Sequence, residues 1–432
     1  MSALTLPRFA AACAVAAFLT TAHAEPSVTK IVKDDKGNFT LLYNGKPYII
    51  KGAGGSHFLA ELVKYGGNSI RTWGIESLDE SVDGKPLIKR AEELGISVAA
   101  GIWIKGERQG VSYKDQKFLE AQREEVRAAV RKYKDEPALL IWSLGNEAEG
   151  VIGPGDNPDV WKEFNVLADI VHKEDPNHPV MTVIAGAAPT KIKAAMQYYP
   201  NIDILGVNAY ASAPGVGKAL REAGWAKPFV LTEFGPVGHW EVAKAPWGAP
   251  VEPSSKDKAA NYFVTQKTVG EKGAGLYLGS YCFLWGQKQE VTSTWYGMFL
   301  KSGEKLPTVD AMNKAWTGAW PANRSPRIEA LESTIRETNV APGTTVTATV
   351  TTKDFENDPV QIEWEVVPES TDLKIGGDAE SEPPPVKDAI VSQKDGEVTI
   401  RTPDKSGPYR LFVTVRDGKG GASKDNFPFL VK

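Results

Sequence analysis

Cysteine and histidine are scarce in this chain, and each shortage excludes a class of site. The 432 residues include two cysteines and five histidines. Cys13 lies within the first 24 residues, so removal of that segment would leave Cys282 alone. An intrachain disulfide and a cysteine-based zinc site would then be impossible. No H-E-x-x-H or H-x-x-E-H pair occurs either, so we expect no metal and no cofactor.

An excess of basic residues is also missing. The formal net charge is −4, with 42% hydrophobic and 24% charged residues. A nucleic-acid surface needs a basic stripe, and none is present. We therefore expect a globular protein of ordinary composition that binds no nucleic acid and does not span a membrane.

The N-terminal 24 residues read as a cleaved secretory signal. They carry one positive charge at Arg8, then a short apolar run, and end in Ala22-His23-Ala24, the A-x-A pattern of a signal-peptidase site. The run is shorter than the ~20 residues of a membrane anchor. We expect a mature chain that starts near Glu25, with 49 basic and 54 acidic residues, in the periplasm or outside the cell.

Eight short apolar runs alternate with helical patterns between residues 28 and 320. An amphipathic stretch at residues 115–134 is one of those helical patterns. Repeated strand–helix alternation of this kind predicts a (β/α)₈ TIM barrel over residues 25–320. A doubly wound sheet is the alternative, but no G-x-G-x-x-G follows the first run. The runs are residues 47–54, 67–74, 95–103, 138–147, 178–186, 202–210, 227–235 and 275–285.

Two further segments extend this architecture. A hairpin with Asn44-Gly45 at its turn is expected to cap the barrel floor. After a linker at residues 321–327, alternating strands without helices predict an all-β, Ig-like sandwich over residues 321–432. Its strands are expected at 344–352, 360–367, 396–402 and 409–417, and the Pro-rich residues 368–385 are expected to be a mobile loop.

Two of the predicted strands end on a glutamate. Glu147 closes the fourth run, "ALLIWSLGNE", and the strand in the seventh run, "KPFVLTEFG", is expected to end at Glu233. In a TIM barrel the C-terminal ends of the strands surround the active site, so both carboxylates face one mouth. Burying a carboxylate is unfavourable unless it has a partner or a role. A structural role, with bonds to backbone or to Arg71, is the alternative for each glutamate.

Paired carboxylates at a barrel mouth suit the cleavage of a glycosidic bond. One carboxyl must hold a proton for the leaving oxygen, while the other must stay ionised to attack the sugar. Their mutual repulsion separates the two pKa values. Glu147 and Glu233 are therefore the predicted catalytic residues.

The motifs "IWSLGNEAEG", "VLTEFG" and "FLWG" resemble glycoside hydrolase clan A, the retaining (β/α)₈ enzymes that include families two and five. The resemblance covers residues 38–300. It implies that Glu147 is the general acid/base and Glu233 the nucleophile of a double displacement. It also implies that Asn146 touches the sugar 2-hydroxyl.

The same resemblance implies roles for three more residues. Arg71 in "NSIRTWG" matches the strand-two arginine that keeps the nucleophile ionised, which suits its forked guanidinium. Tyr210 in "GVNAY" matches the strand-six aromatic, and Trp285 matches the strand-eight tryptophan that forms the platform of the −1 subsite. In the C-terminal part, the segments "DFENDPVQIEWEV" and "YRLFVTVRDGKGG" resemble bacterial Ig-like, PKD or cadherin-like modules.

The chain also departs from the family pattern. Asn208 stands where many members carry a histidine, and the N-terminal sandwich domains of family-two enzymes are missing. Further residues at strand ends are expected either to line the substrate cleft or to pack the rim. These are Trp73, Trp103, His57, His239 and Trp240.

The sequence thus predicts an exported, retaining β-glycoside hydrolase or transglycosylase that acts on a β-glucan-like poly- or oligosaccharide. One rival is a non-catalytic carbohydrate-binding barrel, which would have no need of both glutamates. A barrel lyase or aldolase is a second rival, but it would want a lysine at a strand end or a metal cluster. Lys51 lies inside the first run and Lys105 lies beyond the third.

Overall fold

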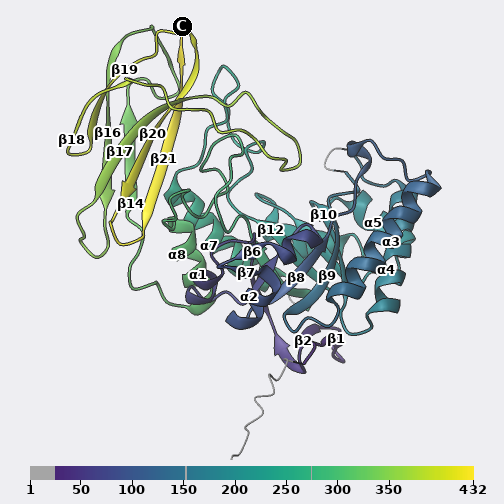
Figure 1. Ribbon diagram of the computed structural model, residues 1–432. Helices are drawn as coiled ribbons and strands as arrows, with labels where there is room; N and C mark the ends of the chain where they lie inside the picture. The colour runs from purple at the N-terminus through teal and green to yellow at the C-terminus, as the bar shows by residue number, and fades with distance from the viewer. Residues whose placement is uncertain (1–24, 151–152, 274) are drawn as a thin grey trace, which may run out of the picture.

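A computed structural model describes residues 25–150, 153–273 and 275–432 in two packed units, a barrel and a β-sandwich (Figure 1). The predicted signal segment lies outside the described residues. None of the described helices is both long enough and apolar enough to cross a membrane.

Eight parallel strands close into the predicted barrel, which confirms the TIM-barrel fold. Each strand falls within one of the eight apolar runs, because strands with both faces covered are apolar throughout. In order around the barrel, starting from the first, the strands are β4 (Ile50–Gly54), β5 (Ser69–Arg71), β8 (Ser97–Ile102), β9 (Leu139–Asn146), β10 (Val180–Ala185), β11 (Ile204–Asn208), β12 (Phe229–Phe234) and β13 (Tyr277–Cys282).

Helices surround this barrel. The amphipathic stretch forms α3, which begins after Asp115, whose carboxylate accepts hydrogen bonds from Lys117 N and Phe118 N. Leu119, Val126 and Val130 are buried on its inner face. The helices are α1 (Leu59–Lys64), α2 (Leu87–Leu94), α3 (Gln116–Tyr133), α4 (Pro158–Glu174), α5 (Pro189–Tyr198), α6 (Val216–Glu222), α7 (Ser255–Lys272) and α8 (Pro307–Thr317).

The expected hairpin lies at the N-terminal end of the barrel, as β2 (Phe39–Tyr43) and β3 (Lys46–Tyr48), with β1 (Thr29–Lys33) beside it. Asn44 and Gly45 have φ angles of 49° and 76°, as a two-residue hairpin turn requires. Leu41 is fully buried and packs with Ile141 and Met181 of the barrel interior. The hairpin therefore closes the floor and leaves the opposite end for a site.

The C-terminal region is a sandwich of two four-stranded sheets around a separate core that contains Trp364 and Val413. The four predicted strands are all present. One sheet holds β14 (Arg327–Ser333), β16 (Thr345–Lys353), β19 (Glu397–Arg401) and β18 (Ile390–Lys394). The other holds β15 (Asn339–Val340), β21 (Ala422–Val431), β20 (Gly407–Arg416) and β17 (Gln361–Pro368).

A buried polar network joins the sandwich to the barrel. Asn426 Nδ2 donates to Glu252 Oε2 over 2.7 Å, and Ser255 N at the start of α7 donates to Asp425 Oδ1 over 2.7 Å. Glu252 is also paired with the buried Lys258. Asn426 Nδ2 and Ser255 N would each lose a buried partner if the units separated, so the sandwich is held in a fixed place on the barrel.

Candidate active site

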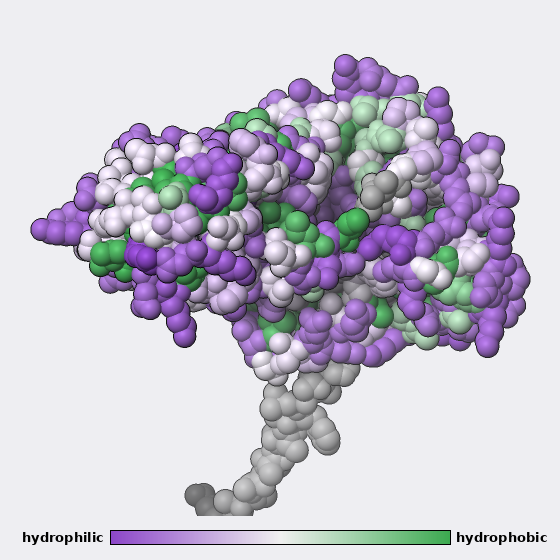
Figure 2. Space-filling view, turned by 90° about the horizontal axis from the view of Figure 1, so that it is seen from above, coloured by the Kyte–Doolittle hydropathy of each residue, from purple (hydrophilic) through white to green (hydrophobic). Residues whose placement is uncertain are grey.

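The polar residues at the strand ends gather at the end of the barrel opposite β1 and β2. Arg71 ends β5, Asn146 ends β9, Asn208 ends β11, and Glu233 lies one residue before the end of β12. Glu147 follows β9 directly. Parallel strands place all five at one mouth. Viewed from this side, the molecule has a hollow between the sandwich and the barrel helices (Figure 2).

Glu233 is a buried carboxylate with three donors. Its Oε1 accepts from Arg71 Nη1 at 3.0 Å and from Trp73 Nε1 at 3.1 Å. Its Oε2 accepts from Tyr210 OH at 3.0 Å. Burial and the charge of Glu233 raise the pKa of Tyr210 well above its usual range, so the hydroxyl keeps the proton it donates. These donors stabilise a negative charge on Glu233 and fix both oxygens.

Glu147 has a different environment. Burial, followed by the negative charge of Glu233, raises its pKa to about 7, while the hydrogen bond from Asn208 opposes that rise. Asn208 Nδ2 donates to Glu147 Oε1 at 2.8 Å. The backbone of Glu147 has a left-handed φ of 54°, unusual for a residue other than glycine. This carboxyl is therefore held in a strained turn and keeps its proton up to neutral pH.

A chain of hydrogen bonds joins the two glutamates. Besides its bond to Glu233, Arg71 donates from Nη2 to Asn146 Oδ1 at 2.7 Å. Asn208 Nδ2 donates to the same Asn146 oxygen at 3.1 Å as well as to Glu147. Because each amide and guanidinium group has its orientation fixed by the next, the two carboxyl groups are positioned as one unit.

A second ion pair, which the sequence interpretation missed, supports the turn at Glu147. Glu149 Oε1 accepts from Lys191 Nζ and from Ala185 N, both at 2.8 Å. Lys191 Nζ also donates to Gly150 O and Ala185 O at 2.8 Å. Both side chains are almost fully buried. The only sequence signal was a second acid two residues after Glu147, and nothing in the sequence pointed to a partner on α5.

Aromatic side chains form the wall beside Glu233. Trp73 and Tyr210 each pack edge-on against Phe283, with ring centroids 5.8 and 6.4 Å apart. Trp240 is 56% exposed and packs edge-on against Tyr210. His239 Nδ1 lies 3.1 Å from Tyr296 OH, and burial lowers the pKa of this histidine. Trp240 thus leaves more than half of its surface accessible beside Tyr210.

Two other predicted cleft residues are less involved. His57 is exposed on the loop after β4, and Trp103 is half-buried directly after β8. Among the described contacts, no hydrogen bond joins either of them to Glu147 or Glu233. Their predicted roles in binding stay predictions.

Trp285 does not form the expected platform, and this prediction is wrong. Its side chain is fully buried, and its Nε1 donates to Phe58 O at 3.0 Å. The ring packs against Phe299 and Trp316 instead of bordering the mouth. Two residues before it, Phe283 contacts Trp73 and Tyr210. The sequence interpretation missed this aromatic, although it stands in the same "FLWG" motif.

Among the residues that the structure describes, no group of three or more His, Cys, Asp or Glu side chains is arranged to hold a metal ion.

Residues 87–238 match the family model described as "Glycosyl hydrolases family 2, TIM barrel domain". The matched range contains both glutamates, Asn146 and Asn208, and it covers about a third of the chain. Together with the closed barrel, this match supports a clan A glycoside hydrolase. A search of curated proteins finds no match.

Solved structures share the fold at low identity. β-Glucuronidase 2 of Bacteroides uniformis is 14% identical, with 94% of this chain and 48% of that chain covered and a TM-score of 0.51. The β-glucuronidase of Bifidobacterium dentium is 18% identical, with 68% and 49% covered and a TM-score of 0.51. This chain thus spans about half the length of those proteins, and the likeness shows the fold.

Proposed function

We propose that this protein is a retaining β-glycoside hydrolase or transglycosylase that acts on a β-glucan-like poly- or oligosaccharide. The observation that carries the proposal is the contrast between its two mouth carboxyls. Glu147 has a pKa raised to about 7, whereas Glu233 accepts hydrogen bonds from Arg71, Trp73 and Tyr210. A glycosidase needs one protonated and one ionised carboxyl at the same bond.

In the first step, a carboxylate oxygen of Glu233 forms a bond to the anomeric carbon as the glycosidic C–O bond breaks. Glu147 gives its proton to the departing oxygen. Arg71, Trp73 and Tyr210 hold Glu233 in the orientation for attack. The products are a glycosyl ester on Glu233 and a free sugar or alcohol, with Glu147 left as a carboxylate.

In the second step, Glu147 takes a proton from water or from a sugar hydroxyl, whose oxygen attacks the anomeric carbon and releases Glu233. The negative charge of Glu233 is one cause of the raised pKa of Glu147. Esterification removes that charge, so the pKa of Glu147 falls when the residue must act as a base. Water as acceptor gives hydrolysis, and a sugar hydroxyl gives transglycosylation.

One solved relative supports a covalent intermediate. The Bacteroides uniformis β-glucuronidase 2 structure has the protein covalently bound to cyclophellitol-6-carboxylate aziridine. Export to the periplasm or the outside of the cell remains part of the proposal and is supported by the A-x-A pattern at residues 22–24.

A product screen tests this function. The purified mature protein is incubated with a panel of β-linked glucans, mannans and galactans, and the products are identified by chromatography and mass spectrometry. Shorter products indicate a hydrolase, and longer or cyclic products indicate a transglycosylase. If no sugar of the panel is changed and the Glu233→Gln variant binds no oligosaccharide, the proposed enzymatic function is contradicted. A carbohydrate-binding role then also has no support for the sugars tested.

A further inference from the structure

The segment between β17 and β18 leaves the sandwich and reaches over the barrel. We call residues 369–385 the sandwich arm. In Figure 1 this yellow-green segment extends from the sandwich above the barrel strands, toward the blue loops that precede α3. The sequence suggested a mobile loop here, but the described contacts hold the arm at its tip and at its base.

Two cations from the barrel hold the tip of the arm. Lys288 Nζ donates to Gly377 O at 2.9 Å, and Arg108 Nη1 donates to Asp378 Oδ2 at 3.2 Å. Gly376 and Gly377 have φ angles of 71° and 76°. A Cβ at Gly376 would lie 3.0 Å from Arg108 Nη2, and one at Gly377 would lie 3.0 Å from Lys288 Nζ. The tip favours glycines because both residues have positive φ angles, which other residues rarely adopt.

The base of the arm is braced as well. Glu380 Oε2 accepts from Val291 N of the barrel at 2.7 Å, and its Oε1 accepts from Lys374 N of the arm at 3.0 Å. Asp372 Oδ2 accepts from the backbone N and the hydroxyl of Ser381, both at 2.9 Å. These bonds tie the outgoing and returning limbs of the arm together, so it has a defined shape.

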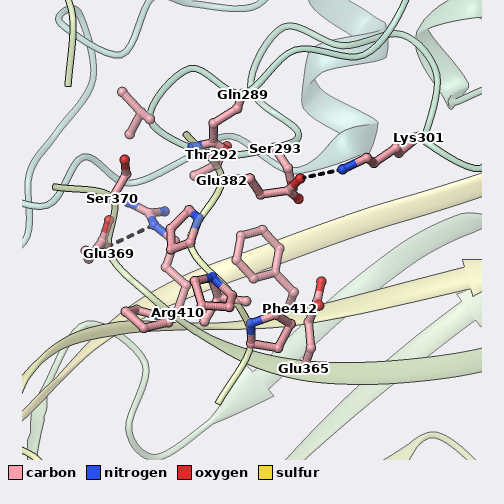
Figure 3. A pocket seen from close by; sticks show the side chains of 16 residues that line it. Gln289, Thr292, Ser293, Lys301, Glu365, Glu369, Ser370, Glu382, Arg410 and Phe412 are labelled. Atoms are coloured by element: carbon pink, nitrogen blue, oxygen red, sulfur yellow. Dashed lines mark hydrogen bonds and ion pairs between the residues drawn. The ribbon is translucent and has the colours of Figure 1, made fainter. Parts of the chain in front are cut away.

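A cavity of about 360 Å³ lies between the base of the arm and the loop after β13 (Figure 3). Glu382 of the arm is directed toward Lys301, and Glu369 toward Arg410 of the sandwich, at 3.3 and 2.9 Å. Arg410 also donates to Pro250 O of the barrel at 2.6 Å. The arm is thus connected to the fixed junction between the two units.

The anchor points place the arm relative to the two glutamates. Arg108 belongs to the loop after β8, and Lys288 and Val291 belong to the loop after β13. Strands β4 and β5 lie between β13 and β8 in the barrel. The tip therefore bridges the mouth on the β4 and β5 side, while β10 and β11 form the other side. Glu147 follows β9, which lies between β8 and β10, and Glu233 belongs to β12, which lies between β11 and β13. The two glutamates therefore stand at the boundaries between the two sides of the mouth.

Electrostatics around Glu290 agree with this placement. Burial raises the pKa of Glu290, and the negative charges of Glu233 and of Glu380 on the arm add to that rise. Lys288, which pairs with Glu290 at 2.7 Å, opposes it. The catalytic carboxylate and the arm therefore act on one side chain in the loop after β13.

We propose that the sandwich arm is the specificity-determining wall of the cleft, which closes it on the β4 and β5 side and limits how many sugar units can extend past the glutamates there. This inference rests on the proposed glycosidase function. A saccharide whose anomeric carbon lies between Glu147 and Glu233 extends toward the two sides of the mouth that these residues separate. One of those sides ends at the arm, so a long chain cannot pass through the cleft.

Trimming the arm tests this wall. In the full chain, residues 372–381 are replaced by Gly-Gly-Ser-Gly. The intact protein and this trimmed variant are each incubated with aryl β-glycosides and with end-labelled β-linked oligosaccharides of increasing length. The intact protein should cleave every oligosaccharide at one position counted from one end. The trimmed variant should cleave at several positions and gain about tenfold or more in kcat/KM on the longest substrate. Its kcat/KM on aryl glycosides should stay within about threefold.

A point variant covers the case in which trimming disturbs folding. Arg108→Ala releases the tip from the loop after β8 and should shift the cleavage pattern in the same direction. Arg131→Ala is the matched control, because Arg131 pairs with Glu174 on the surface of α3 and α4. If the intact, trimmed and Arg108→Ala proteins all cleave at the same positions and still cleave aryl glycosides, the proposed role of the arm is contradicted. The glycosidase function is then unaffected. If the intact protein turns over none of the substrates, the glycosidase function is contradicted, and so is the role of the arm that rests on it.

Discussion

Asn208 Nδ2 donates a hydrogen bond of 2.8 Å to Oε1 of Glu147. Thr232 Oγ1 in turn donates to Asn208 Oδ1 at 2.8 Å, which fixes the amide with its NH₂ group toward the glutamate. This bond lowers the pKa of Glu147, whereas burial and the charge of Glu233 raise it. The balance leaves the carboxyl with a pKa of about 7, near the pH at which it must both give and take a proton.

The alkaline limb of the pH–rate profile should report this group. Glu147 must be protonated for the first step, so kcat/KM should fall as the pH rises through about 7. Asn208→Ala removes a bond that stabilises the charged form, and the limb should therefore move to higher pH. Asn201→Ala, at an exposed asparagine bonded to Asp169, is the control and should leave the limb in place. A shift of the alkaline limb to lower pH in Asn208→Ala would contradict the assignment of this limb to Glu147.

Glu147→Ala should separate substrates by their leaving groups. Aryl glycosides with acidic leaving groups need no proton and should lose little in the first step, whereas substrates with poor leaving groups should lose about 10²–10⁴-fold in kcat/KM. Azide should restore turnover of the activated substrates, because it attacks the glycosyl-enzyme without a general base. Steady-state kinetics with two leaving groups, with and without azide, checks this. Equal losses on both substrates would argue against an acid/base role.

Glu233→Gln should lose activity on all substrates regardless of the leaving group, by about 10⁴-fold or more, because an amide cannot form the glycosyl ester. It should still bind oligosaccharide, as measured by calorimetry. Glu163→Gln is a matched control at a buried glutamate paired with Arg123 away from the mouth. Mild, similar losses in Glu147→Ala and Glu233→Gln would remove the basis for two distinct catalytic roles.

Lys191→Met should destabilise the fold. The change removes three hydrogen bonds and leaves Glu149 buried without its cation, a loss that costs about 3–5 kcal/mol in unfolding free energy. Denaturant unfolding of the wild-type protein and the variant measures this loss of unfolding free energy. The double variant Lys191→Met/Glu149→Gln should recover part of the stability, because the remaining group is neutral. No recovery would mean that the unpaired charge is not the cause of the loss.

Much of the barrel could be predicted from the sequence, because a parallel strand covered on both faces is a short apolar run with a detectable end. The two glutamates stood out for the same reason, as carboxylates that close such runs. The hairpin at Asn44 and Gly45 could be predicted because only a few residues adopt its turn. These features depend on local sequence, which one chain supplies.

Features that depend on three-dimensional packing could not be predicted. Trp285 lies beyond the end of β13, where no strand periodicity sets the direction of a side chain, and it packs inward against Phe299. The sandwich arm is polar and Pro-rich, which suggested mobility, but Arg108 and Lys288 hold it from distant parts of the chain. The partnership of Glu149 and Lys191 likewise joins residues 42 positions apart.

The position of a trapped glycosyl group on the protein would identify the nucleophile directly. The protein is incubated with a panel of activated 2-deoxy-2-fluoro-β-glycosides, which slow the second step, and is then digested for peptide mass spectrometry. We expect one sugar adduct, on Glu233, which is absent from the Glu233→Gln variant and present in Glu147→Ala. An adduct on Glu147, or turnover of these sugars with no adduct on either glutamate, would contradict the assignment of Glu233 as the nucleophile.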